Sequence, residues 1–142
     1  MTENELIAFV RACGLAVVAT SGPDGAPEAA LVGIASTDRA ELLFDTSTSS
    51  RKYANLAADP RVAVVIGWED EVTCQVEGRA DVLQGAELRR GQQFYFEQYP
   101  DGRKRASEPE IALIRIRPRW LRYSDYRPDT VSSEVTEFAG QG

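Results

Sequence analysis

Residues 46–52 hold the side chains of this sequence that are best suited to bind an anion. Thr46 ends an apolar segment, and four further hydroxyl residues lead to Arg51 and Lys52 at the start of an amphipathic segment. Partnerless backbone N–H groups and the positive end of the helix dipole meet at a helix start, so an anion is stabilised there. Two cations at that point are mildly unfavourable for the helix alone, and this mismatch favours a bound anion. We therefore predict a phosphate site at this strand–turn–helix junction.

The sequence contains no histidine, which limits the chemistry that its side chains can supply. Ser-His-Asp and Cys-His nucleophilic sites, most zinc sites and histidine-ligated haem all need that residue. We therefore predict no metal site and assign no catalytic side chain. If the protein is an enzyme, we expect a cofactor to supply the reactive atom.

Composition narrows the choice of partners and of cellular location. The formal net charge of −6 argues against a general nucleic-acid binder, because that affinity comes from clustered Lys and Arg. Cys13 and Cys74 lie far apart in the sequence, and we interpret both as reduced core residues of a cytoplasmic protein. No apolar run approaches the roughly 18 residues that cross a membrane, and the acidic residues 1–5 do not read as a signal peptide.

The elements around the phosphate site are short helices and strands joined by tight turns. Helices are predicted over residues 2–13, from Ser50 to a stop at Asp59-Pro60, and over residues 86–98. Strands are predicted over residues 15–20, 28–36, from 42 to the phosphate site, 62–68, 72–83 and 111–126. Six strands in this order favour an antiparallel barrel in a mainly β fold with short helices, the α+β class. We predict one domain over residues 1–126 and a mobile or loosely docked tail over residues 127–142.

Several finer features follow from the same reading of residue types. Gly78 is predicted to form a bulge or a barrel corner, and Pro118 is predicted to interrupt or bulge the last strand. Arg115, Arg117 and Arg119 share one face in strand periodicity, so we predict a cross-strand charge ladder with Glu77 and Asp81. The basic residues 103–105 are interpreted as a solvated loop.

The ordered set of motifs resembles the pyridoxamine 5′-phosphate oxidase-like family of FMN-binding split β-barrels over about residues 5–126. The motifs are Asp24-Gly25-Ala26-Pro27, Phe44-Asp45-Thr46, Ser50-Arg51-Lys52, Asn55-Leu56, Asp59-Pro60-Arg61-Val62 and Val76-Glu77-Gly78-Arg79-Ala80. The resemblance implies a six-stranded split barrel that forms a homodimer with two FMN molecules at the subunit interface.

The resemblance also implies which residues hold the flavin. The residues that match the family's phosphate contacts are Thr46, Ser50, Arg51 and Lys52. Thr73 aligns with a glutamine on the later strand of the family. Trp120 is a candidate for flavin contact from the partner chain, or it plugs the barrel end or the interface.

The sequence departs from the family members that oxidise pyridoxamine phosphate. It has Asp45 in place of a tyrosine and Thr73 in place of the glutamine, and it lacks their Arg-x-His motif. We therefore expect an FMN-dependent oxidoreductase that passes hydride between the flavin and a nicotinamide donor or another small molecule. The alternatives are a non-catalytic flavin-binding or redox-sensing module, and a reductase that uses the deazaflavin F420. Whether Asp45 is repelled by the phosphate or turned away from it stays open.

Overall fold

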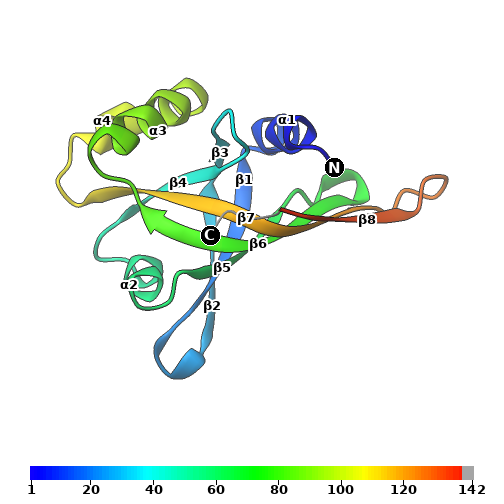
Figure 1. Ribbon diagram of the computed structural model, residues 1–142, viewed down its shortest axis with the longest axis horizontal. Coiled ribbons are helices and arrows are strands. Elements are labelled where there is room, and N and C mark those ends of the chain that lie inside the picture. Colours follow the sequence, from blue (N-terminus) through cyan, green and yellow to red (C-terminus); the bar gives the residue numbers. More distant parts are fainter. Residues whose placement is uncertain (139–142) are drawn as a thin grey trace.

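The computed structural model describes residues 1–138 of the chain. Within this range eight strands form one antiparallel sheet, and four α-helices lie around it (Figure 1). The α-helices are α1 (Glu3–Cys13), α2 (Arg51–Ala58), α3 (Gly85–Gln98) and α4 (Gly102–Ala106), and two short 3₁₀ helices are Pro23–Gly25 and Glu69–Glu71. The strands are β1 (Leu15–Ser21), β2 (Pro27–Gly33), β3 (Ala35–Ser36), β4 (Leu42–Ser47), β5 (Arg61–Ile66), β6 (Val72–Val82), β7 (Ile111–Asp125) and β8 (Ser132–Glu137). The predicted α+β class and antiparallel sheet are confirmed, and the strand number of six was too low.

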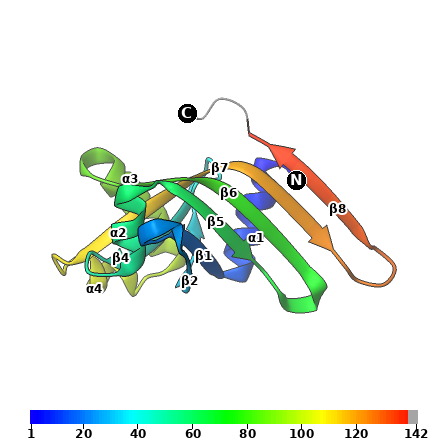
Figure 2. The ribbon, with the colours of Figure 1, turned by 90° about the horizontal axis from the view of Figure 1, so that it is seen from below.

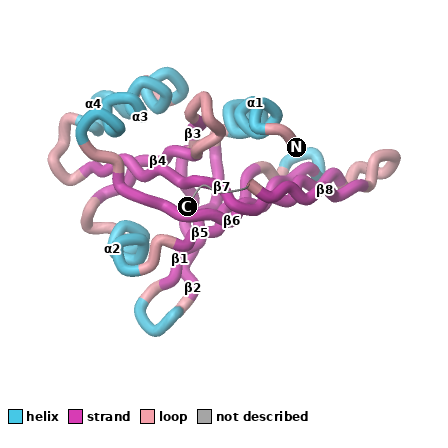
Figure 3. Tube along the Cα trace, viewed as in Figure 1, coloured by secondary structure: helices cyan, strands magenta, loops and turns pink. Residues whose placement is uncertain are grey.

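The sheet curls back on itself around a buried interior. Its strand order is β2-β1-β5-β6-β7-β4-β3, with β8 paired to β7 beside this path. β2 and β4 contact each other although they belong to opposite ends of the order, so the sheet forms a split barrel rather than a flat layer. Figure 2 shows β5, β6, β7 and β8 side by side, and Figure 3 shows the helices around the strands.

Alternating side chains place the core inside this curl. Along β5 and β6, buried and exposed residues alternate, as expected when one face of a strand is covered. Leu6 and Val10 of α1 are fully buried against the same interior as Phe44 of β4 and Ile116 of β7. Among the described residues, no helix is both long and apolar enough to cross a membrane.

Three predicted boundaries were wrong for reasons of backbone geometry. The strand predicted over residues 28–36 is divided at Ile34, because β2 pairs with β1 whereas β3 pairs with β4. Trp68 lies outside β5, since Gly67 with φ of 79° ends the strand before it. The basic residues 103–105 lie in α4 rather than in a loop.

The predicted bulge is present where β6 meets β7. Glu77 pairs with Trp120 and Gly78 pairs with Pro118, so Arg119 is the extra residue on β7. Strand β7 continues through Pro118 without a break. The bulge moves the register by one residue, and Glu77 therefore faces a tryptophan rather than an arginine.

Of the two acidic residues in the predicted charge ladder, only Asp81 forms an ion pair with an arginine of β7. Asp81 is the cross-strand partner of Arg115, and Arg115 Nη2 lies 2.7 Å from Asp81 Oδ2. The same guanidinium lies 3.3 Å from Glu87 of α3, and its side chain is 9% exposed. Glu77 is absent from this network because of the bulge.

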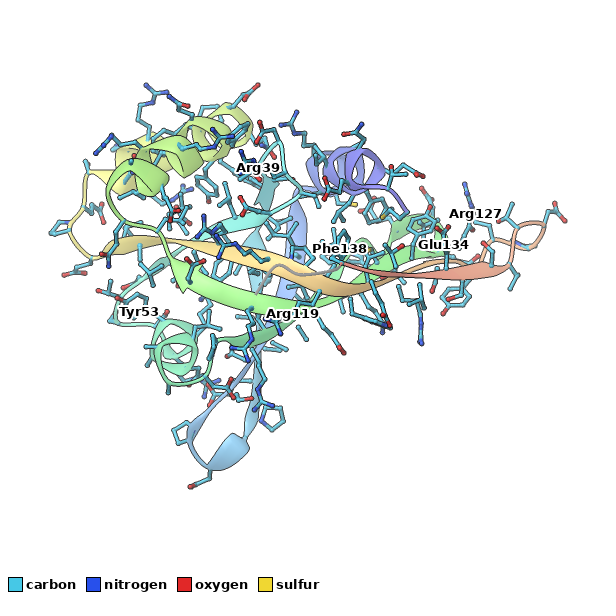
Figure 4. The ribbon with its side chains drawn as sticks, viewed as in Figure 1. Arg39, Tyr53, Arg119, Arg127, Glu134 and Phe138 are labelled. Carbon is cyan, nitrogen blue, oxygen red and sulfur yellow. The ribbon has the colours of Figure 1, made fainter. Side chains whose placement is uncertain are left out.

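Strand β8 lies within the segment predicted as a tail. It pairs with Trp120–Asp125 of β7, and Glu134 of β8 accepts a hydrogen bond from the amino group of Met1. Phe138 N donates to Arg119 O at 2.9 Å, and Figure 4 shows both residues near the middle of the molecule. The sequence pattern predicts no strand here, because β8 is almost entirely exposed and its one large apolar side chain is Val135. The domain boundary at residue 126 and the mobility of the segment stay predictions, and residues 139–142 of the predicted tail lie outside the described residues.

Candidate functional site

The junction between β4 and α2 brings two of the predicted phosphate contacts together. Ser50 is the N-cap of α2, with φ of −74° and ψ of 154°, and its Oγ accepts from Tyr53 N at 3.2 Å. Its hydroxyl also lies 2.9 Å from Thr46 Oγ1 at the end of β4. Figure 4 shows Tyr53 on α2. Thr46 is buried, so the hydroxyl pair ties the end of the strand to the first turn of the helix.

Arg51 and Lys52 line a small cavity between α2 and the β1–β2 hairpin. The cavity measures about 140 Å³, and its other lining residues are Val18, Thr20, Glu28, Ala29 and Ala30. Arg51 Nε lies 3.2 Å from Glu28 Oε1, while the Arg51 side chain is 77% exposed. Thr46 and Ser50, which are both described residues, do not line this cavity. The predicted contacts therefore form two adjoining groups, one of hydroxyls and one of cations.

Sequence reasoning missed the polar residues that the hairpin contributes to this cavity. Asn55 Nδ2 donates to Thr20 Oγ1 at 2.9 Å and to Glu28 Oε1 at 2.8 Å. Thr20 and Glu28 are cross-strand partners on β1 and β2. A signal was present in the sequence, because a hairpin closed by the turn at residues 22–26 places these two residues opposite each other. The sequence alone did not indicate that this hairpin lies against α2.

Asp45 faces away from the predicted phosphate contacts. Successive strand residues point to opposite faces, so Asp45 lies on the other side of β4 from Thr46. Its Oδ2 accepts from Arg105 Nε of α4 at 2.8 Å. Asp45 lines a separate cavity of about 160 Å³ together with Tyr95. Burial, with a smaller contribution from the Asp45 charge, raises the pKa of Tyr95 to about 12. The open question about Asp45 is thus answered by its pairing with Arg105.

Thr73 and Trp120 lie away from the β4–α2 junction within one copy of the chain. Thr73 pairs with Ser124 near the hairpin that joins β5 to β6. Trp120 lines a groove of about 500 Å³, and Thr20, which also lines the Arg51–Lys52 cavity, belongs to the lining of this groove. The guanidinium of Arg122 lies 5.2 Å from the centre of the Trp120 ring. One copy of the chain does not bring these two residues to the β4–α2 junction, and their role toward a flavin stays a prediction.

The outer face of the sheet carries cross-strand rows of small and apolar side chains beside Trp120. Val17 pairs with Val65 and Ala19 pairs with Ala63 across β1 and β5. These four residues line a second groove of about 360 Å³ that also includes Trp120. We call the rows and the two grooves the outer face.

The donor set at the β4–α2 junction fits a phosphate group, with one opposing charge. The helix start offers N–H groups, Thr46 and Ser50 offer hydroxyls, and Arg51 and Lys52 offer charged donors. Glu28 is the acidic group in direct contact with this set, through Arg51. Within residues 1–138, Cys, Asp and Glu side chains form no group of three or more that could hold a metal ion.

Comparison with solved structures supports the split-barrel fold. A haem-binding protein from Mycobacterium smegmatis superposes with a TM-score of 0.80 at 18% identity, covering 96% of this chain and 58% of that protein. A conserved hypothetical protein from Mycobacterium tuberculosis gives a TM-score of 0.75 at 26% identity, covering 98% and 94% of the two chains. The first likeness shows the fold alone, because its sequence identity is low.

Comparison of sequences assigns the chain to a family. A pyridoxine/pyridoxamine 5′-phosphate oxidase from Trichormus variabilis is 31% identical over 99 residues, which cover 69% of this chain and 44% of that relative. The chain thus spans less than half the length of that relative. The family model for pyridoxamine 5′-phosphate oxidase matches residues 2–125. Since the match extends over most of the sequence, the chain belongs to the pyridoxamine 5′-phosphate oxidase family.

Proposed function

We propose that this protein binds FMN through the β4–α2 junction and acts as an FMN-dependent oxidoreductase on a small molecule. The observation that carries the proposal is the grouping at the helix start. The Thr46–Ser50 hydroxyl pair stands beside Arg51 and Lys52 at positions that match the phosphate contacts of the family. A bound flavin would supply hydride transfer, and the residues of this chain would hold and orient its phosphate.

We further propose that the substrate is not pyridoxamine phosphate. The support comes from residues within the matched region rather than from the relatives' names. Asp45 replaces the tyrosine of the family's oxidases and is engaged with Arg105 on the opposite side of β4. Thr73 replaces their glutamine, and the sequence offers no histidine for an Arg-x-His motif.

A deazaflavin reductase is the second candidate, and one observation favours it. Glu28 lies in the cavity with Arg51 and Lys52, so the three side chains together carry one net positive charge. The phosphate group of F420 is a phosphodiester and carries one negative charge, which equals the net positive charge of these three side chains. A non-catalytic flavin-binding module remains as a third candidate, because no side chain at the junction has an assigned catalytic role.

A homodimer through the outer face completes the proposal. The support is the exposed apolar row that includes Val65, together with Trp120 in the adjoining grooves. If FMN lies at such an interface, Thr73 and Trp120 would approach it from the partner chain. We also propose a cytoplasmic location, from the interpretation of Cys13 and Cys74 as reduced residues.

The first test identifies the cofactor. The full chain is purified, its absorbance spectrum is recorded, and the mass of the molecule released on denaturation is measured. FMN supports the leading proposal, F420 supports the second candidate, and failure to take up FMN at high concentration rules out the FMN site. Anaerobic addition of NADH or NADPH then separates an enzyme, in which the flavin is reduced within seconds, from a passive binder.

The second test addresses the two cations. Arg51→Ala and Lys52→Ala should each weaken FMN binding by about 1.5–3 kcal/mol, because each removes a charged hydrogen bond to the phosphate. Dissociation constants are measured by fluorescence quenching of the flavin. Riboflavin, which has no phosphate, should bind the variants and the unchanged protein alike. Arg89→Ala on the exposed face of α3 serves as the control variant. An unchanged FMN dissociation constant in both site variants would show that the phosphate lies elsewhere.

A further inference from the structure

The Glu28 carboxylate is built into the phosphate site by three separate features. Its Oε1 accepts from Asn55 Nδ2 at 2.8 Å, and Asn55 is itself buried on α2. Its position opposite Thr20 follows from the register of the β1–β2 hairpin. Its Oε2 occupies space that a side chain at Gly22 would fill, so a glycine leaves room for it. The carboxylate is therefore held by the fold and not only by its ion pair.

The two partners of the Glu28–Arg51 ion pair differ in how firmly they are held. The Glu28 side chain is 16% exposed, whereas the Arg51 side chain is 77% exposed and makes the ion pair through Nε at 3.2 Å. A long and exposed side chain loses little when it leaves a surface ion pair. Arg51 can therefore turn toward a ligand, while Glu28 stays at the wall of the cavity with its negative charge.

This arrangement lowers the net positive charge that the cavity presents to a bound phosphate. Arg51 and Lys52 carry two positive charges, and Glu28 removes one of them. A phosphate monoester carries about −1.5 to −2 near pH 7, whereas a phosphodiester carries one negative charge. Charges a few ångströms apart at a partly exposed site interact appreciably, so the second charge of a monoester is opposed by the carboxylate.

We propose that Glu28 is a specificity-determining residue of the phosphate site. Its carboxylate lowers the affinity for a dianionic phosphomonoester more than the affinity for a singly charged phosphodiester on the same flavin. This inference rests on the proposed flavin-binding function and deepens it, since it names the residue that sets how strongly the site discriminates between the two classes of phosphate.

The test uses three ligands that differ only at the end of the ribityl chain. They are FMN, its 5′-methyl phosphodiester, and riboflavin, with about two, one and no negative charges respectively. Dissociation constants are measured for the full chain and for Glu28→Gln, which keeps the side-chain shape and an oxygen that accepts from Asn55. Asp24→Asn removes the same charge at the exposed tip of the same hairpin and serves as the matched control.

We expect the effect of Glu28→Gln on the dissociation constant to increase with the negative charge of the ligand. Glu28→Gln should tighten FMN binding by roughly tenfold and binding of the diester by about threefold. Riboflavin binding should change by less than about twofold, and Asp24→Asn should leave all three dissociation constants near their original values.

The contrary results are distinct from one another. Equal effects on FMN and the diester, or no effect on either, overturn the role of Glu28 while leaving a phosphate site that still prefers FMN to riboflavin. Weaker FMN binding in Glu28→Gln, with an unchanged melting temperature, overturns it in favour of Glu28 as a positioning partner for Arg51. If the unchanged protein binds FMN no better than riboflavin, the phosphate site itself fails and the charge preference fails with it.

Discussion

At the scale of single residues, the protein buries titratable groups that the proposed site does not use. Cys74 is fully buried in the core, and burial raises the pKa of its thiol to about 12. Tyr95 is 2% exposed beneath α4, and burial raises the pKa of its phenol to about 12 as well. In both cases the folded chain favours the neutral form, so the unfolded chain ionises first as the pH rises.

The resulting prediction is a loss of stability in alkaline solution. Stability from these groups is fully present below pH about 9, and it falls as the pH rises toward 12, where the folded groups also ionise. At pH 11 the Tyr95 contribution to this loss should be about 1 kcal/mol.

Urea unfolding at pH 8 and pH 11 measures the effect. Tyr95→Phe removes one ionisation and keeps the ring, so it should lose less stability than the unchanged protein between the two pH values. Tyr126→Phe, at an exposed tyrosine, should follow the unchanged protein. Equal losses in all three proteins would contradict the assignment to Tyr95.

At the scale of elements, the β6–β7 bulge sets which side chains reach the outer face. Gly78 faces the backbone of Arg117, and an added Cβ would overlap the carbonyl oxygen of that residue. A backbone atom in a sheet ladder cannot move aside as a flexible side chain can. The close approach brings Pro118 opposite Gly78 and Trp120 opposite Glu77. The absence of a side chain at Gly78 therefore helps to set the position of Trp120, a proposed flavin contact.

Gly78→Ala tests this close approach. The extra methyl group should lower the free energy of unfolding by about 1–3 kcal/mol, the range seen for overpacked sites. The Trp120 environment should change with it, visible as a shift in tryptophan fluorescence. Glu77→Ala, at the exposed neighbouring position, should change stability by no more than about 0.5 kcal/mol. Full stability in Gly78→Ala would contradict the close approach of the two strands at this position.

At the scale of the whole molecule, the curl of the sheet separates an inner face from an outer face. The inner face is filled by the core, and the outer face carries the apolar row and the two grooves. An exposed apolar surface of this kind is typical of an interface. The proposed homodimer would cover the outer face and bring Trp120 of one copy toward the other.

Light scattering measures the mass of the protein in solution and therefore tests for the homodimer. The protein should have a mass of twice 15.6 kDa. Ala63→Glu places a charge in the centre of the outer face, where Ala63 lines both grooves, and should yield single chains that bind FMN more weakly. Arg89→Glu on α3 should leave the mass unchanged. A single-chain mass for the unchanged protein would contradict the interface.

Much of the fold was predictable because its signals are local. Thr2 and Gly14 bound α1 and Ser50 caps α2, each through residues only a few positions apart, and the residue type of Gly78 indicates the bulge although its partner strand β7 lies far along the chain. Strand β8 was missed because its exposed side chains show no buried face, and it depends on pairing with β7. The break at Ile34 was missed because it arises from a change of partner strand.

The group of hydroxyls and cations at the start of α2 is readable from the sequence, because a cap and the first turn of a helix are specified by adjacent residues. The surroundings of that group depend on tertiary contacts. Glu28 reaches Arg51 because the β1–β2 hairpin packs against α2, and Asp45 pairs with Arg105 from α4, 60 positions along the chain. Such contacts depend on how the sheet curls, and the curl depends on strand pairings that no short stretch of sequence specifies.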